Sequence, residues 1–233
     1  MEAFRTGGGI AYADYGEDLC GAQASFTRPL FEQLLGSEWL PSVADVDARL
    51  LAAPGARVAD LACGAGVSSI AIARAYPRVR VDGVDLDPAS VELARANLAG
   101  SGVEDRVRFL VGDAASPRLT GRYDLVTVFE ALHDMSDPVS VLSAARGLLA
   151  ADGCVIVADE RVADSFSAPG DDVERLYYGF SVLHCLPVGM PGAGTGAVMR
   201  VDTVRSYAAA AGFGEAEVLP IDNDFWRFYR LTA

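Results

Sequence analysis

The sequence predicts an α/β protein in which strands and helices alternate around a doubly wound, mainly parallel sheet. Short β-branched runs recur from residue 56 onward, and longer runs of helical periodicity lie between them. The strand candidates are 57–61, 80–84, 107–111, 125–129 and 154–158. The helix candidates between them are 67–75, 88–99 and 138–149. Alternation at this spacing is typical of βαβ units, whose parallel sheet is buried on both faces.

Helix boundary signals agree with this alternation. Asp87 and Asp137 each precede a proline, so each is placed to accept a hydrogen bond from the first turn of a helix. Gly100 and Gly153 stand where those helices are expected to end.

The two ends of the chain have a different pattern. Near the C-terminus, a helix at 202–211 is followed by strands at 216–220 and 225–231. Strands so close in sequence favour antiparallel pairing, because a parallel pair needs a long crossover. Residues 1–55 contain two helical stretches, 23–35 and 43–51, and we expect them to form a helical cap on a domain of residues 56–233.

Composition limits the classes of protein. The 233 residues suit one domain, and 51% hydrophobic residues can form a sizeable core. All 19 basic residues are arginines, and the net charge of −13 argues against nucleic acid and membrane surfaces as partners. The four cysteines have no metal-binding spacing and the N-terminus has no apolar signal segment. We therefore expect reduced thiols in a cytoplasmic protein.

A glycine turn is the most informative local feature. The strand candidate 57–61 runs through Asp60 into Gly64 and Gly66, and a helix follows at once. Glycines let the backbone approach a ligand, and the helix start offers free N–H groups. At the end of the next strand, Asp85 can accept both ribose hydroxyls of a nucleotide cofactor.

Three details distinguish between cofactor classes. Ser69 stands where a dinucleotide fingerprint needs its third glycine. Asp60 before the turn suits an ammonium group better than a pyrophosphate. Asp113, after the third strand, can accept a hydrogen bond from an adenine amino group. Together these acids match the amine, ribose and adenine of S-adenosylmethionine.

From residue 56 to its end, the chain resembles the class I S-adenosylmethionine-dependent methyltransferases. The resemblance implies a Rossmann-like seven-stranded sheet whose last strand is antiparallel. It also implies that Asp85 holds the ribose and that Ala62 replaces the first glycine of the common pattern. The cofactor-binding positions that it implies are Asp60, Ala62, Gly64, Gly66, Asp85, Leu86, Asp113, Ala114 and Phe129.

A second group of polar residues follows the fourth strand. His133 and Asp134 resemble the His-Asp-Trp motif of small-molecule O-methyltransferases, with Met135 in place of the Trp. In that family the His is the general base, and Asp159 matches the acid that orients it. An imidazole can remove the proton that makes a phenol or alcohol a poor nucleophile. The alternative is that His133 caps a loop or stacks on the cofactor without transferring a proton.

Residues 177–199 contain no Asp, Glu, Lys or Arg, which is unusual in so acidic a chain. We expect this segment to form the wall and lid of an acceptor pocket; the alternative is that it completes the core. His184 is a second catalytic candidate, or a satisfied polar group in an apolar lid. The candidate acceptor-binding residues are Tyr12, Tyr15, Leu183, Leu186 and Met190.

The sequence therefore predicts a methyltransferase that uses S-adenosylmethionine on a small, apolar or aromatic acceptor, most simply at oxygen. Residues 1–55 do not resemble the winged-helix dimerisation region of those O-methyltransferases, and a homodimer stays open. Residues 177–199 resemble bacterial methyltransferase-like proteins, some labelled as regulators, so a binding protein without turnover is the alternative. Ser69 argues against a dinucleotide oxidoreductase. No metal is expected, because Asp159 is followed by Glu160 where metal-dependent relatives have an Asp-Asn pair.

Overall fold

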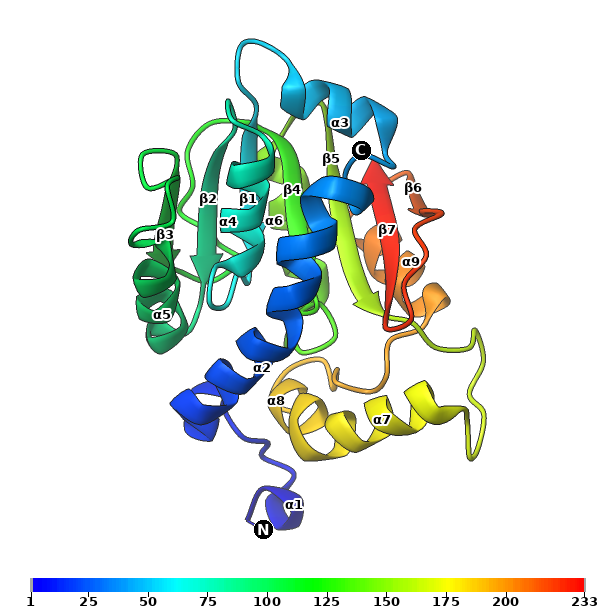
Figure 1. The fold of residues 1–233 in the computed structure, drawn as a ribbon. Coiled ribbons are helices and arrows are strands. Elements are labelled where there is room, and N and C mark those ends of the chain that lie inside the picture. The colour runs from blue at the N-terminus through cyan, green and yellow to red at the C-terminus, as the bar shows by residue number, and fades with distance from the viewer. Residues whose placement is uncertain (1, 233) are drawn as a thin grey trace.

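The computed structural model describes residues 2–232 and has one seven-stranded sheet at its centre (Figure 1). The strand order is β3-β2-β1-β4-β5-β7-β6. The strands are β1 (Arg57–Leu61), β2 (Arg80–Asp85), β3 (Val107–Val111), β4 (Tyr123–Phe129), β5 (Leu149–Glu160), β6 (Glu215–Val218) and β7 (Trp226–Thr232). The first five pair in parallel, whereas β7 runs antiparallel to both β5 and β6. The predicted doubly wound fold with an antiparallel last strand is confirmed.

Helices cover both faces of the sheet. They are α3 (Ala44–Leu51), α4 (Val67–Ala75), α5 (Pro88–Leu98), α6 (Pro138–Leu148) and α9 (Val201–Ala210). The first three pack with the helix η2 described below on one face, and α6 and α9 pack on the other. Because both faces are covered, the central strands β1 and β4 are almost entirely buried, and most of their residues are apolar.

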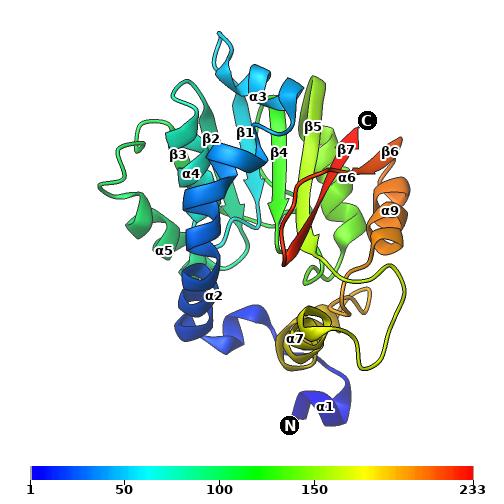
Figure 2. The ribbon, with the colours of Figure 1, turned by 45° about the vertical axis from the view of Figure 1, so that its right-hand side comes forward.

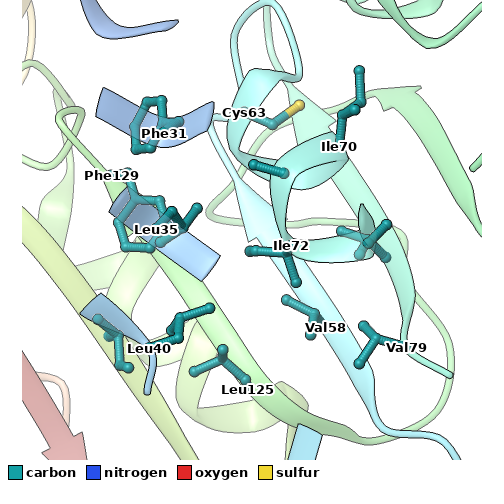
Figure 3. Packing of buried hydrophobic residues seen from close by; sticks show 14 of the residues in the cluster. Phe31, Leu35, Leu40, Val58, Cys63, Ile70, Ile72, Val79, Leu125 and Phe129 are labelled. Carbon is teal, nitrogen blue, oxygen red and sulfur yellow. The ribbon is translucent and has the colours of Figure 1, made fainter. Parts of the chain in front are cut away.

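The N-terminal region begins with α1 (Glu2–Thr6), the short turn η1 (Tyr12–Tyr15) and α2 (Glu17–Leu30). The last of these continues as the π-helical stretch η2 (Phe31–Trp39). Phe31, Leu35 and Leu40 belong to the same buried cluster as β1 and β4, and Figure 3 shows Phe31 and Leu35 close to Phe129. The second half of this region is therefore part of the domain core.

The structure confirms two predicted helix starts and corrects one predicted helix end. Asp87 and Asp137 accept hydrogen bonds from the backbone N–H groups of Ser90 and Ser140, at 2.9 and 3.0 Å. Gly153, in contrast, does not end a helix but lies within β5. A Cβ atom there would lie 2.7 Å from the carbonyl oxygen of Tyr123, so close packing against β4 requires this glycine.

The segment after β5 forms α7 (Asp172–Phe180), η3 (Ser181–Cys185) and α8 (Leu186–Gly189). These helices lie beyond the carboxyl ends of the central strands (Figure 2). In open α/β sheets that edge is where ligands bind. Among residues 2–232, no helix has both the length and the apolar character that a membrane crossing demands.

Candidate active site

A cavity of about 1010 Å³ lies between the carboxyl ends of the strands and the helices α2, α7 and η3. Its volume is at the upper end of the range for small-molecule sites, about 300–1,000 Å³, so it has room for a cofactor and a second molecule. Its lining is mostly apolar, with polar side chains gathered at the ends of β1, β2, β4 and β5. The cavity thus has two ends, which differ in how they are built.

The end beside β1 and β2, which we call the cofactor end, begins with the glycine turn. Gly64 and Gly66 have φ angles of +50° and +73°, which glycine adopts without strain. A Cβ atom on Gly66 would lie 2.3 Å from the Phe109 ring, so only glycine fits there. Ala62 has a φ of +56°, a left-handed conformation that is strained for an alanine.

Asp60, on the strand before this turn, holds the turn in place through hydrogen bonds. Its side chain accepts hydrogen bonds from the hydroxyls of Ser68 and Ser69, both at 2.6 Å, and from Thr127 at 2.7 Å. Burial raises the pKa of Asp60, which is 1% exposed. These three hydrogen bonds hold the start of α4, and Asp60 also lines the cavity. Ser69, in place of the third glycine, is one of its partners.

Asp85 projects at the end of β2 and joins the turn to the next helix. Its two oxygens accept hydrogen bonds from the backbone N–H groups of Gly64 and Asp87, at 2.7 and 2.9 Å. A carboxylate has about four acceptor positions, so it can still bind a diol. The neighbouring Leu86 leaves 69% of its surface exposed, and Asp113 and Ala114 line the same cavity. This donor and acceptor set fits the ribose and adenine of S-adenosylmethionine.

The other end, the acceptor end, is centred on His133. Its Nδ1 lies 2.9 Å from Asp159 Oδ1, and its Nε2 lies 3.3 Å from Asp134 Oδ1. Burial alone would lower the pKa of His133, but the carboxylates of Asp134 and Asp159 raise it well above its usual value. The structure thus brings the predicted pair His133 and Asp159 together and adds Asp134 as a third member.

Two further carboxyl groups surround this pair. Burial raises the pKa of Glu130 and of Glu160 to about 7 in each case. Glu130 has a φ of +50°, a strained conformation at the end of β4 that directs the following loop. Glu160 accepts a hydrogen bond from the backbone N–H of Met199 and so connects β5 to the segment before α9.

The acceptor end also contains side chains of the types that bind metal ions. Potential ligand atoms of His133, Asp159 and Glu160 lie within 4.8 Å of one another, as do those of His133, Asp134 and Cys185. Asp159 already accepts hydrogen bonds from the backbone N–H groups of His133 and Glu160, at 3.3 and 2.9 Å. Asp159 also contacts the His133 ring, so its carboxylate is part of a hydrogen-bonded network within the protein.

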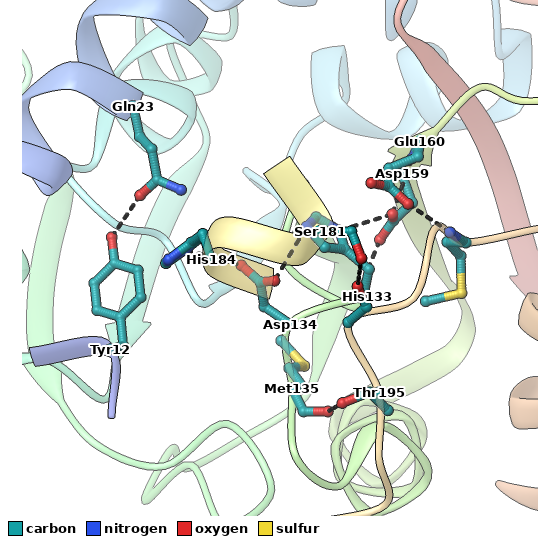
Figure 4. A network of polar contacts seen from close by, with 12 residues as sticks. Tyr12, Gln23, His133, Asp134, Met135, Asp159, Glu160, Ser181, His184 and Thr195 are labelled. Atoms are coloured by element: carbon teal, nitrogen blue, oxygen red, sulfur yellow. Dashed lines mark hydrogen bonds and ion pairs between the residues drawn. The ribbon is translucent and has the colours of Figure 1, made fainter. Parts of the chain in front are cut away.

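His184 lies on η3 and is only 6% exposed. Its Nε2 is 3.5 Å from Asp134 Oδ2, and its ring meets Tyr12 and Tyr15 edge-on, with centroids 5.6 and 4.7 Å apart. Figure 4 shows Asp134 between His133 and His184. Both predicted histidines therefore lie at the same end of the cavity.

The segment 177–199 borders the cavity, and its predicted residue His184 lines it, but three of the predicted acceptor-binding residues do not. Its lining side chains are Tyr177, Phe180, His184, Cys185, Val188 and Pro191. Leu183 is 72% exposed, and Leu186 and Met190 do not line the cavity. The reason is the helical period: α7, η3 and α8 present one face to the cavity, and Leu183 and Leu186 lie on another.

The two N-terminal tyrosines also differ. Tyr12 lines the cavity, and its hydroxyl donates a hydrogen bond to Gln23 Oε1 at 2.7 Å. Tyr15 instead donates to the carbonyl of Leu183 at 3.0 Å and so fastens the N-terminal segment to η3. Tyr12 is thus a wall residue, and Tyr15 holds the wall in place.

Sequence reasoning missed the apolar rim of the cavity. Phe26 on α2 and Leu176 and Phe180 on α7 line the cavity while remaining 50%, 42% and 49% exposed. Leu176, Phe180 and His184 are spaced four residues apart, a helical signal that could have identified this face. Phe26 carried no such signal, because its position opposite α7 depends on the tertiary fold.

The sequence also matches a family of known proteins. A family model described as "Methyltransferase domain" matches residues 52–187, which include the glycine turn, Asp85 and His133. The chain belongs to this methyltransferase family. The match confirms the resemblance to class I methyltransferases and the cofactor that it implies, S-adenosylmethionine.

Individual relatives cover the chain in part. A ubiquinone biosynthesis O-methyltransferase from Bordetella avium is 37% identical over 101 residues, which are 43% of this chain and 41% of that relative. An O-methyltransferase family protein from Burkholderia thailandensis has a TM-score of 0.74 at 18% identity, over 99% of this chain and 66% of that one. An O-methyltransferase from neocarzinostatin biosynthesis, solved with S-adenosyl-L-homocysteine and 1,4-dihydroxy-2-naphthoic acid, has a TM-score of 0.67 at 19% identity, over 100% and 66%. At these identities the solved structures support the fold alone, and the chain spans less than half of the curated relative's length.

Proposed function

We propose that this chain transfers a methyl group from S-adenosylmethionine to a hydroxyl oxygen of a small, largely apolar or aromatic molecule, with His133 as general base. The observation that carries the proposal is the contact between His133 Nδ1 and Asp159 Oδ1, at 2.9 Å, in a cavity that also contains a cofactor end. A base oriented by a carboxylate is what activation of a hydroxyl nucleophile requires.

Bound S-adenosylmethionine would supply an electrophilic methyl group on its sulfonium sulfur. Asp85 would accept hydrogen bonds from its ribose hydroxyls, and Leu86 and Ala114 would contact its adenine. The glycine turn lets the backbone of residues 62–66 approach the amino acid portion closely. These residues would bind and orient the cofactor, whereas the residues at the acceptor end would transfer the proton.

His133 uses its two ring nitrogens differently. Asp159 holds the proton on Nδ1, which leaves Nε2 as the atom that takes the proton of the acceptor hydroxyl. Because neighbouring carboxylates raise the pKa of His133, they favour the charged imidazole in the free protein. We therefore expect kcat/KM to rise with pH, as the fraction of unprotonated His133 grows, up to its raised pKa.

The apolar part of the cavity determines which acceptors fit. Phe129 also lines the cavity, and Phe26, Leu176 and Phe180 form the exposed rim. Aromatic and aliphatic walls with a few polar groups at one end favour a flat apolar molecule whose hydroxyl points to the polar end. The dihydroxynaphthoic acid named for the neocarzinostatin enzyme is a molecule of that kind.

The test is a methyl-transfer assay with S-adenosylmethionine and a panel of phenols, hydroxynaphthalenes and aliphatic alcohols, with products measured by mass spectrometry. We expect O-methylated aromatic products. His133→Ala and His133→Asn should lower kcat by about 10²–10⁴-fold, because general-base catalysis contributes that much. Calorimetry should show unchanged affinity for S-adenosylhomocysteine in both variants.

Two outcomes would contradict this proposal in different ways. Binding of S-adenosylhomocysteine without methylation of any acceptor class would favour the second interpretation, a binding protein without turnover. Methylation by both His133 variants at the wild-type rate across the pH range would remove His133 as the base.

A further inference from the structure

Asp134 stands between two imidazoles and forms a well-aligned hydrogen bond with neither. Its Oδ1 is 3.3 Å from His133 Nε2, and its Oδ2 is 3.5 Å from His184 Nε2. Asp134 Oδ1 and both ring nitrogens of His184 are buried without a hydrogen-bond partner in the described chain. Buried polar groups normally have hydrogen-bond partners, because leaving one without a partner is unfavourable. This arrangement is therefore poised to settle toward either histidine.

The contact with His133 affects the atom that the proposed reaction needs. Asp159 occupies Nδ1, so Nε2 has to receive the acceptor proton, and Nε2 is the atom that Asp134 faces. While Asp134 stays there, its negative charge favours a proton on His133 and its carboxylate occupies the approach to Nε2. Catalysis by His133 requires Asp134 to move aside.

His184 offers the place to which Asp134 can move. Edge contacts with Tyr12 and Tyr15 hold the His184 ring, and Tyr15 is itself bonded to the carbonyl of Leu183 at 3.0 Å. The Asp134 loop is held as well, because Thr195 donates a hydrogen bond to the carbonyl of Met135 at 2.6 Å. With both backbones held, a rotation of the Asp134 side chain is the simplest change that pairs it fully with His184.

We propose that His184 is a positioning residue that draws the Asp134 carboxylate away from His133 Nε2, which frees that atom to accept the acceptor proton. The inference rests on the proposed function for the role of His133. It assigns His184 no contact with the reacting atoms: His184 acts only through Asp134, and Asp134 acts on the charge and accessibility of His133.

Other charged and titratable groups also face His133 and would contribute to its titration. They are Glu130 at the end of β4, Asp159 and Glu160 on β5, Tyr177 on α7 and Cys185 on η3. Of these, Cys185 also contacts Asp134, but it does so as a thiol, whereas Asp134 is the carboxylate that faces both imidazoles. A change at position 184 should therefore reach His133 mainly through Asp134.

The direction of each effect follows from electrostatics. A carboxylate close to an imidazole favours its protonated form, and sharing that carboxylate with a second donor weakens the effect. When the imidazole at position 184 is removed, the Asp134 carboxylate interacts with His133 alone. His133 should then titrate at higher pH. Removing the charge at position 134 should move the titration of His133 to lower pH. The two substitutions thus have opposite signs.

The chain contains two histidines, so NMR can follow His133 directly. We would record the imidazole Cε1–Hε1 signals against pH in the wild type, Asp134→Asn, His184→Phe and His184→Asn. The Phe variant keeps a ring against Tyr12 and Tyr15, and the Asn variant keeps a polar group, so one can serve if the other does not fold. In both His184 variants the single remaining signal is that of His133.

We expect the titration midpoint of His133 to fall by about one pH unit or more in Asp134→Asn and to rise by a smaller amount in the His184 variants. The pH profiles of kcat/KM should move in the same directions. An unchanged midpoint in the folded His184 variants, or a shift in the same direction as in Asp134→Asn, would overturn the inference.

The two proposals can fail separately. The NMR titration needs neither acceptor nor turnover, so opposite shifts in a protein that methylates nothing would leave the sharing of Asp134 intact and remove the proposed function. The converse result is methylation that depends on His133, with the same titration midpoint of His133 in the wild type and the His184 variants. That result would contradict the role of His184 and leave the proposed function intact.

Discussion

The two ends of the cavity are built from different parts of the chain. The cofactor end is built mainly from backbone atoms: Ala62, Gly64 and Gly66 have left-handed conformations, and two backbone N–H groups hold Asp85. At the acceptor end, side chains from the loop after β4, from β5 and from η3 converge on one network around His133. The first end depends on local sequence and the second on tertiary packing.

Because the two ends are built differently, they should tolerate amino-acid substitutions differently. A backbone-built site tolerates few changes, because a Cβ atom on Gly66 would meet Phe109. A side-chain network can be altered one member at a time, and each change shifts the charges of the others. Substitutions at the cofactor end should therefore change cofactor affinity alone, and those at the acceptor end should change rate, pH dependence or acceptor KM.

Among substitutions that compare the two ends of the cavity, Asp85→Ala should have the largest effect, and it should act on cofactor affinity. Loss of an ionised acceptor for two hydroxyls costs about 1.5–3 kcal/mol, so affinity for S-adenosylhomocysteine should fall about 10–100-fold. Acceptor KM, measured at saturating cofactor, should barely move. Calorimetry measures the first quantity and steady-state kinetics the second.

Asp113→Ala is the matched control, because Asp113 also lines the cavity but accepts a bond from the backbone N–H of Ala115 in its own loop, at 2.8 Å. Its loss should weaken cofactor binding less than the loss of Asp85. An equal effect of both substitutions, or a rise in acceptor KM with Asp85→Ala, would show that the two ends are not independent.

A smaller effect is expected at the rim of the acceptor end. Phe180→Ala should raise acceptor KM about tenfold, because partial burial of a Phe side chain contributes about 1.4 kcal/mol. Leu183→Ala is the control: it lies three residues away and is more exposed, but its side chain does not line the cavity. Steady-state kinetics at saturating cofactor separates the two, and equal KM values for both variants would contradict the assignment of the rim.

The sequence allowed the glycine turn and the place of Asp85 beside it to be predicted, because the signals for both are short-range. A strand, a glycine turn and an acid at the next strand end place Gly64, Gly66 and Asp85 together in any parallel sheet. The function of Asp60 was harder to predict, since its partner Thr127 comes from a different strand.

The acceptor end could be predicted only in outline. The motif around His133 and the strand end at Asp159 indicated a base and its partner, and the sheet rule brought them to one edge. Which face of 177–199 meets the cavity depends on where α7 begins, and the chain from Asp172 onward sets that helical phase. Two leucines and Met190 were therefore assigned to a face that points elsewhere. The place of Asp134 between two histidines also requires η3 to dock, which no local pattern encodes.

The smallest effect is expected from Ala62→Gly, which isolates the backbone contribution to the cofactor end. Ala62 has a φ of +56°, and a left-handed alanine costs about 1–2 kcal/mol relative to its preferred conformations. Glycine removes that strain but gains about 0.4–1 kcal/mol of unfolded-state freedom, so the net stabilisation should lie between about 0 and 1.6 kcal/mol. Urea denaturation measures it. Ala65→Gly is the matched control in the same turn, because Ala65 is not among the residues with positive φ and should only lose stability. Equal destabilisation by both substitutions would mean that the turn relaxes around Ala62, and that the backbone at this end is less rigid than the side-chain network opposite.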